Sequence, residues 1–202
     1  MLSYLAPSPD RATTVLSNGG HVVLAPAWLS ADEASDLEQE FLRTADWEKH
    51  FFPRLVAWYG SFDYVYSGVT HRAVALTPTL AALRARVETF VFGESRGQYQ
   101  GVLLNQYRDG RDSVGFHADD ESMIRKDSPI ASLSLGGTRA FHLAHHPPHG
   151  QPRAASVELA LTHGSLLVMG GTIQRHWRHS VPKEPSVRAG RINLTFRQYK
   201  TG

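Results

Sequence analysis

The sequence predicts a mainly β fold with flanking helices, an α+β chain of the sandwich or jelly-roll type. From residue 101 onward, short apolar or alternating runs are separated by Gly, Pro and Asp, with no helical pattern between them. Strands of this length at this spacing are typical of a jelly roll, whereas a parallel α/β sheet needs crossover helices. The expected strands are Val102 to Tyr107, Ile130 to Leu135, Ala140 to Ala144, Val157 to Leu161, Ser165 to Met169 and Arg191 to Gln198.

Two helices are expected before this β half. The segment Ser30 to Glu33 is a capping box, and apolar residues recur at helical spacing after it, so a helix should run to about Thr44. Pro78 suits the first turn of a second helix, which should end at Phe92 because Gly93 follows. Both helices should flank the sheets.

Length and composition favour a single domain over residues 1–202. The chain has 202 residues and 42% hydrophobic content, enough for one substantial core. It has no cysteine, which excludes disulfides and thiolate metal ligands, and its 11 histidines supply candidate ligands instead. The net charge is only +2, and the sequence has no basic leader or long apolar run. We therefore expect a cytoplasmic monomer with no membrane segment.

The N-terminal residues are expected to form a loose arm. Residues 1 to about 20 contain Pro, Asn and Gly among polar residues, and a short strand should follow at His21 to Leu24.

A histidine and a carboxylate at i and i+2 form a candidate metal site. His117 and Asp119 point to the same side of an extended segment and can share one cation. Alone, such a pair is more often a loop histidine beside solvated acids. Downstream of an apolar strand, His176 and His179 offer a third ligand, and on an extended chain only one of them can face the metal. Two histidines and one carboxylate form the facial triad of non-haem Fe(II) oxygenases.

The last strand carries a polar row at period two. Arg191, Asn193, Thr195 and Arg197 share one of its faces. Such a row is costly to bury unless it meets an anion, and guanidinium binds carboxylates through a two-point fork. This face suits a dicarboxylate whose other end chelates iron. The alternative is the solvent face of an edge strand, since polar-out alternation is the default in antiparallel sheets.

Four segments stand together in a characteristic order: Asn105-Gln106-Tyr107, His117-Ala118-Asp119, His179-Ser180-Val181-Pro182 and Arg191 to Arg197. In this combination the chain resembles the AlkB family of Fe(II)- and 2-oxoglutarate-dependent dioxygenases. The resemblance covers residues 102–199 well and the preceding half more loosely. Within the family, the chain is similar to the DNA-repair branch, whose motifs appear here at His117 to Glu121 and Ser128 to Ser132. It implies a double-stranded β-helix, with a catalytic core at about 101–199 and a nucleotide-recognition region at about 45–75.

The resemblance also implies roles for individual residues. His117, Asp119 and His179 would bind Fe(II), and His176 would lie outside the ligand set. Arg191 would pair with the distal carboxylate of 2-oxoglutarate. The metal-bound end and neighbouring groups would be held by Asn105, Tyr107, Asn193 and Arg197. The segment that would line a base pocket contains Tyr64 for a polar contact, Tyr66 for stacking and Ser67, and Glu121 would contact the base edge. Without the family, this segment fits a plain strand with aromatic residues on one face.

The activity implied is oxidative dealkylation. Fe(II), 2-oxoglutarate and O₂ would oxidise N-alkylated bases in DNA, for example 1-methyladenine or 3-methylcytosine, with release of an aldehyde, succinate and CO₂. A base in a duplex cannot reach buried iron, so the substrate would be single-stranded DNA or locally opened duplex, or RNA. Phosphates would be contacted by a basic rim drawn from Arg108, Arg111, Arg125, Lys126, Arg139 and Arg175.

Two other functions fit the sequence. One is the same chemistry on RNA, a protein or a small molecule. The other is a cupin-like binding module whose histidines are structural or bind zinc, although such a module needs no row of arginine and asparagine. Duplex preference is a further question: duplex-specialised homologues carry a longer wedge hairpin than Trp47 to Pro53. Phe51 or Phe52 is a candidate wedge, but an apolar pair after a helix is more often core.

Overall fold

The computed structural model of the chain describes residues 11–66 and 68–200, without the side chain of Tyr66. The strands are β1 (Ala12–Val15), β2 (Gly20–Ala25), β3 (Glu48–Lys49), β4 (Leu55–Gly60), β5 (Tyr64–Tyr66), β6 (Val69–His71), β7 (Gly101–Tyr107), β8 (Val114–His117), β9 (Ile130–Gly136), β10 (Arg139–His145), β11 (Val157–Leu161), β12 (Leu166–Gly171), β13 (Trp177–Val181) and β14 (Arg191–Arg197). The helices are the 3₁₀ turn η1 (Ser17–Gly19), α1 (Ala31–Thr44), α2 (Pro78–Phe92) and α3 (Ile173–His176).

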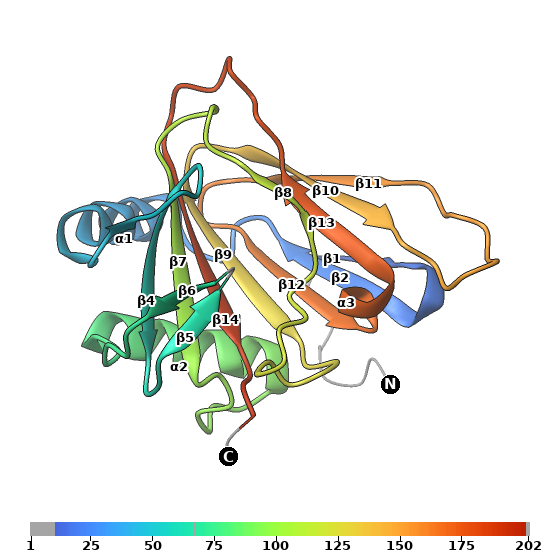
Figure 1. Cartoon of the computed structure of the whole chain (residues 1–202). Coiled ribbons are helices and arrows are strands. Elements are labelled where there is room, and N and C mark those ends of the chain that lie inside the picture. Colours follow the sequence, from blue (N-terminus) through green and yellow to red (C-terminus); the bar gives the residue numbers. More distant parts are fainter. Residues whose placement is uncertain (1–10, 67, 201–202) are drawn as a thin grey trace.

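Two facing sheets form the jelly roll that the sequence predicts (Figure 1). The larger sheet has the order β1-β2-β12-β9-β14-β7-β4-β3, and the smaller has the order β11-β10-β13-β8. Apolar side chains from both pack together between them, including Leu167 of the larger sheet and Leu143 and Trp177 of the smaller. This interior layer brings the strands of the second half of the chain around one central space.

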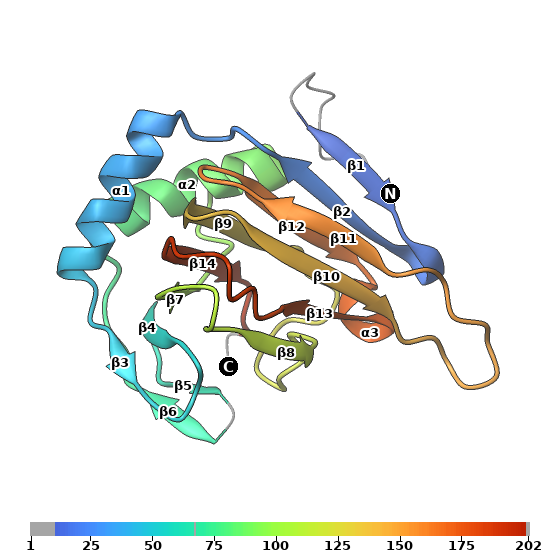
Figure 2. The ribbon, with the colours of Figure 1, turned by 90° about the horizontal axis from the view of Figure 1, so that it is seen from above.

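The helices α1 and α2 cover the outer face of the larger sheet (Figure 2). Their boundaries agree with the predicted ones. The N–H of Glu33 donates to the hydroxyl of Ser30 at 3.2 Å, which closes the predicted cap of α1. Gly93 ends α2 with a φ of 80°, a left-handed conformation that glycine adopts without strain. The apolar stripes of both helices thus seal one side of the sheet.

Strand β14 lies in the middle of the larger sheet, hydrogen-bonded to β7 on one side and β9 on the other. Its apolar residues Ile192, Leu194 and Phe196 pack into the core beneath the helices. Because successive strand residues face opposite ways, the alternate residues point between the two sheets. All seven residues of the strand are buried. The alternative of a solvent-facing edge strand is therefore wrong.

The predicted loose arm is wrong for residues 12–20, while residues 1–10 lie outside the described residues. Strand β1 pairs with β2 along the edge of the larger sheet, from Ala12 opposite Leu24 to Val15 opposite His21. Asn18 and Gly19, with φ of 61° and 79°, make the turn between them. These residues indicated looseness in the sequence, but they are also what a tight hairpin turn requires.

The region at 45–75 contains two hairpins that join the rest of the fold. Strand β4 pairs with β7 from Leu55 opposite Gln106 to Gly60 opposite Gly101, so it extends the larger sheet. The short strand β3 pairs with β4, and β5 pairs with β6 in a separate two-stranded sheet. Phe51 lies in the connection between β3 and β4 and is 75% exposed, so it is not core.

No helix among the described residues is long and apolar enough to cross a membrane.

Candidate metal and cosubstrate site

His117, Asp119 and His179 meet between the two sheets. Strands β8 and β13 pair so that His117 lies directly opposite His179, and their ring centroids are 4.2 Å apart. Asp119 follows two residues after His117. One nitrogen or oxygen atom from each side chain lies within 4.8 Å of the others, a spacing from which three ligands can reach one metal ion. The three residues predicted as iron ligands are thus brought together.

The ring of His117 is held in one orientation by its own strand. Its Nδ1 lies 2.9 Å from the carbonyl oxygen of Gly115. A carbonyl only accepts, so in the neutral ring Nδ1 carries the proton and Nε2 keeps its lone pair. That Nε2 lies 3.8 Å from Oδ1 of Asp119. The backbone therefore aims the metal-binding nitrogen at the carboxylate.

Asp119 is buried and fixed from two sides. Arg197 donates from Nε and Nη2 to its two carboxylate oxygens, at 3.1 and 2.8 Å. The N–H of Asp119 donates to Oε1 of Gln174 at 3.0 Å. Burial raises the pKa of Asp119, but Arg197, His179 and His117 outweigh burial and lower the pKa to about 2. The carboxylate is therefore ionised near neutral pH, as a metal ligand must be.

His179 is neutral as well as buried. Burial, together with the neighbouring His117, lowers its pKa to about 3. Its ring also stacks on Phe141, with centroids 5.4 Å apart. His176 does not lie on the same extended segment, because it ends helix α3, and it is not part of the ligand cluster. As predicted, only one of the two histidines belongs to the cluster. The predicted reason was opposite faces of one extended segment, whereas His176 in fact lies in a helix.

Arg191 contributes unsatisfied hydrogen-bond donors to the same cavity. Its Nη2 donates to the hydroxyl of Ser134 at 2.8 Å, and its guanidinium lies 5.2 Å from the centroid of the Tyr107 ring. Among the described residues, Nε and Nη1 are buried without a partner. Burial lowers the pKa of Arg191 to about 10, so it remains a cation at neutral pH. A buried cation with two free donors is a site for an anion, best a carboxylate.

Asn193 and Asn105, which were also predicted to hold the cosubstrate, line the cavity but form hydrogen bonds with other side chains of the protein. Asn193 donates through Nδ2 to Ser132 at 2.7 Å and accepts from Thr195 at 2.8 Å. Oδ1 of Asn105 accepts from Nε of Arg54 at 2.7 Å. They shape the floor of the cavity, with Tyr107 beside Arg191. Arg197 was also predicted here, but its ion pair is with Asp119, so it holds the metal ligand.

The residues predicted to bind the base are distributed differently. Tyr64 is fully buried and stacks on Trp58, with centroids 4.7 Å apart. Its hydroxyl donates to Glu121 at 3.1 Å and lies 3.5 Å from Nη1 of Arg197. Burial raises its pKa, so it stays a neutral donor. The structure gives Tyr64 a core position, which does not support a direct contact with a base. The side chain of Tyr66 and the whole of Ser67 lie outside the described residues.

These side chains fit the pair Fe(II) and 2-oxoglutarate. One cavity is lined both by the His117, Asp119 and His179 cluster and by Arg191. A ligand with a chelating end and a distal carboxylate would satisfy both the open metal positions and the free donors of Arg191. Neither group alone would account for both features.

A family comparison agrees with this fit. Residues 21–197 match the family described as the 2OG-Fe(II) oxygenase superfamily. The chain belongs to this superfamily. Its fold also resembles that of a 2OG-Fe(II) oxygenase family oxidoreductase from Burkholderia pseudomallei, with a TM-score of 0.57 and 23% identity over 90% of this chain and 85% of that one. OsALKBH1 is similar, with a TM-score of 0.62 and 18% identity over 93% of this chain and 100% of that one.

Sequence relatives of this oxygenase chain carry AlkB names, in agreement with the resemblance that the motifs indicated. It is 35% identical over 190 residues to the alpha-ketoglutarate-dependent dioxygenase alkB homolog 3 of Mus musculus, covering 87% of this chain and 65% of that one. It is 40% identical over 154 residues to the DNA oxidative demethylase ALKBH2 of Homo sapiens, covering 74% and 58%. The chain spans 63% to 65% of the length of the alkB homolog 3 relatives.

Several residues of the oxygenase site were not predicted as site residues. Ser132 and Ser134 of β9 contact Asn193 and Arg191, and their alternation in an otherwise apolar strand is a signal that could have found them. Gln174 has no such signal. It reaches Asp119 from helix α3, which is distant in sequence.

Proposed function

We propose that this chain is an Fe(II)- and 2-oxoglutarate-dependent dioxygenase that removes alkyl groups from bases in DNA. The observation that carries the proposal is the pair of free donors on Arg191, buried in the cavity that also holds His117, Asp119 and His179. When bound, Fe(II) and 2-oxoglutarate supply O₂ activation for hydroxylation of an N-alkyl group, which then leaves as an aldehyde.

The protein's own residues bind, orient and exclude water. His117, Asp119 and His179 hold the metal, and Arg191 binds the distal carboxylate. Arg197 keeps Asp119 in place through two hydrogen bonds. Apolar side chains of the cavity keep bulk water from the reacting groups and strengthen the charge interactions inside it. They are Leu103, Val114, Phe141, Met169 and Val181.

A nucleic-acid substrate is supported by the relatives and by a second cavity beside the metal cluster. One relative is named a DNA oxidative demethylase. The second cavity has about 410 Å³ and shares Asp119 with the first. That volume lies within the range of small-ligand sites, about 300 to 1,000 Å³. Glu121 lines this second cavity, and its buried carboxylate oxygen Oε2 has no hydrogen-bond partner among the described residues. This oxygen can accept a hydrogen bond from an N–H on the edge of a base.

The basic rim is narrower than predicted, because Arg108 and Arg111 pair with Asp112 and Asp109 and do not line the second cavity. Arg125, Lys126 and Arg175 line the second cavity and are exposed. Arg139 is fully buried, where it pairs with Glu184 at 2.9 Å, so its place on the rim was wrong. Arg175 pairs with Asp127, so we infer that Arg125 and Lys126 contact the phosphates, because counterion release favours binding by exposed cations.

The proposal is tested by formaldehyde release from single-stranded oligonucleotides with or without 1-methyladenine. Each is incubated with Fe(II) in the presence or absence of 2-oxoglutarate, and the Asp119→Ala protein is the control. We expect release only when lesion, cosubstrate and Asp119 are all present. Release without 2-oxoglutarate, or from the unmodified strand, would contradict the proposal.

The second candidate keeps the oxygenase and changes the substrate to RNA, a protein or a small molecule. Succinate formed by the wild type alone, with no aldehyde from modified DNA, would favour it. A metal-binding module without turnover would form neither product. That the protein works as a monomer stays a prediction, which sedimentation of the loaded protein tests.

A further inference from the structure

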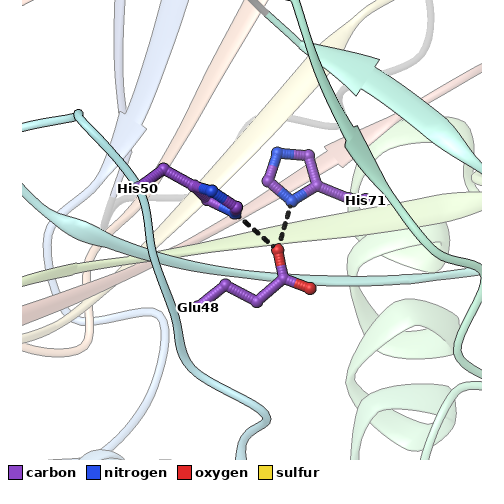
Figure 3. A group of neighbouring side chains, drawn as sticks. All are labelled: Glu48, His50 and His71. Carbon is purple, nitrogen blue, oxygen red and sulfur yellow. Dashed lines mark hydrogen bonds and ion pairs between the residues drawn. The ribbon is translucent and has the colours of Figure 1, made fainter.

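A second cluster of potential metal ligands lies in the region 45–75 (Figure 3), and none of its residues lines the oxygenase cavity. Glu48 ends in a carboxylate on which two imidazoles converge. Nε2 of His50 lies 2.8 Å from its Oε2, and Nδ1 of His71 lies 2.7 Å from the same oxygen. One ligand atom from each residue lies within 4.8 Å of the others. Among the described residues, this is the only such group besides the iron cluster.

The geometry of this cluster suits a bound cation. His71 is fully buried, and its Nε2 has no hydrogen-bond partner among the described residues. Nε2 of His50 and Nδ1 of His71 both face the same carboxylate oxygen. A divalent cation can bind all three side chains through the atoms that already converge.

The donor set selects the class of cation. Two imidazole nitrogens and one carboxylate suit a borderline metal such as Zn²⁺, which binds three protein ligands and leaves one position for water. The hard cations Mg²⁺ and Ca²⁺ prefer oxygen ligands. The described ion pairs of Glu48 are with these two histidines and with no Lys or Arg, so the carboxylate is available for a metal.

We propose that Glu48, His50 and His71 form a binding site for Zn²⁺ or a similar divalent cation. The metal would join two hairpins, because Glu48 and His50 belong to the β3–β4 hairpin and His71 to the β5–β6 hairpin. His71 also lies opposite Tyr64 in the register of β5 and β6, and their rings are stacked with centroids 6.2 Å apart. The cation therefore stabilises the strand that carries Tyr64 and Tyr66 without touching the iron cluster. This proposal stands whatever substrate the oxygenase uses.

The test is Zn²⁺ titration of the metal-free protein by calorimetry, with Co²⁺ absorption as a second readout. We expect two equivalents bound by the wild type, one by His50→Gln and one by His117→Gln, which removes a ligand of the iron cluster. His50 and His117 are partly exposed, so both variants should fold. The matched control is His142→Gln, since His142 pairs with Glu158 at 3.1 Å but has no third ligand. It should still bind two equivalents.

A single equivalent in the wild type, or two in His50→Gln, would overturn the proposal. Thermal unfolding gives an independent check. Zn²⁺ should raise the melting temperature of His117→Gln, and this increase should vanish in His117→Gln combined with His50→Gln. If the His50 variant does not fold, Glu48→Gln replaces it, because it keeps the side-chain size and removes the charged ligand. An unchanged increase in either double variant would contradict the site.

Discussion

Arg197 and Asp119 form a two-point ion pair in the interior, 78 residues apart in the sequence. Both side chains are buried, at 4% and 3% exposure. A buried carboxylate without a partner would be protonated or would move, whereas this one is ionised and held in one orientation. The guanidinium thus positions a metal ligand without binding the metal.

Replacing Arg197 should weaken metal binding. Lysine keeps the charge but cannot form the two-point fork, so Arg197→Lys should reduce Fe(II) affinity by about 10- to 100-fold, as losing a partner that orients a ligand usually does. Anaerobic Fe(II) titration measures the effect. Arg72→Lys is a matched control, because Arg72 pairs with Asp63 on the exposed surface. Equal affinities in the Arg197→Lys and wild-type proteins would show that the ion pair does not position Asp119.

Arg191→Gln should weaken binding of 2-oxoglutarate. Its two free donors would be lost, and each hydrogen bond to a charged group contributes about 1.5–3 kcal/mol, so KM should rise by at least about 100-fold. The rise in KM for 2-oxoglutarate should exceed any change in Fe(II) affinity. Arg188→Gln, at an exposed position, is the control. A larger loss of iron affinity than of cosubstrate affinity would contradict the role of Arg191.

The two downstream histidines should differ in function. His179→Ala removes a member of the ligand cluster and should abolish metal-dependent turnover, whereas His176→Ala should retain most of it, because His176 lies outside the cluster. Succinate formation with saturating Fe(II) provides the measurement. A similar loss in both variants would mean that the ligand assignment is incorrect.

The metal-free protein should lose stability in mild acid through His179. Its pKa falls from 6.5 to about 3 on folding, so between these values the unfolded chain binds a proton that the folded chain does not. The contribution of the neutral ring to the free energy of unfolding is fully present above pH 6.5. Below pH 6.5 this contribution falls by about 1.4 kcal/mol for each pH unit. Urea unfolding at pH 7.5, 6.0 and 5.0 should show a shallower decline for His179→Gln than for the wild type. If the free energy of unfolding fell equally with pH in both proteins, protonation of His179 would not be the cause of the acid destabilisation. Asp119, with its pKa lowered from 3.8 to about 2, adds to the loss only below pH 3.8.

Phe51→Ser should affect substrate use more than stability. The ring is 75% exposed, so the free energy of unfolding should change by no more than about 0.5 kcal/mol. If Phe51 inserts into a base stack, turnover of a lesion in duplex DNA should fall more than turnover in a single strand. Val15→Ser, at a 72% exposed position far along the larger sheet, is the control. Equal turnover ratios in wild type and variant would exclude a wedge role.

Local sequence determined the helices and most strands of the second half. The ends of α1 and α2 are set by Ser30 and Gly93, whose effects act within one turn, so they can be read without the fold. Strand β4 was missed because Leu55–Gly60 is a short apolar run, and such a run does not by itself distinguish strand from helix. Strand β1 was missed because an edge strand is held by backbone pairing, which side-chain patterns do not reveal.

By itself, the sequence determined which residues could carry the chemistry: the spacing of His117 and Asp119, and the period-two row of Arg191 and Arg197. Only the tertiary structure decided what each of them contacts. It buried β14 between β7 and β9, which turned a row that could have faced solvent into the lining of a cavity. It paired Arg197 with Asp119 and left donors of Arg191 free. It also brought Glu48 to His71 across two hairpins. The physical reason is that burial and long-range partners determine whether a charge is satisfied, and neither is encoded in local spacing.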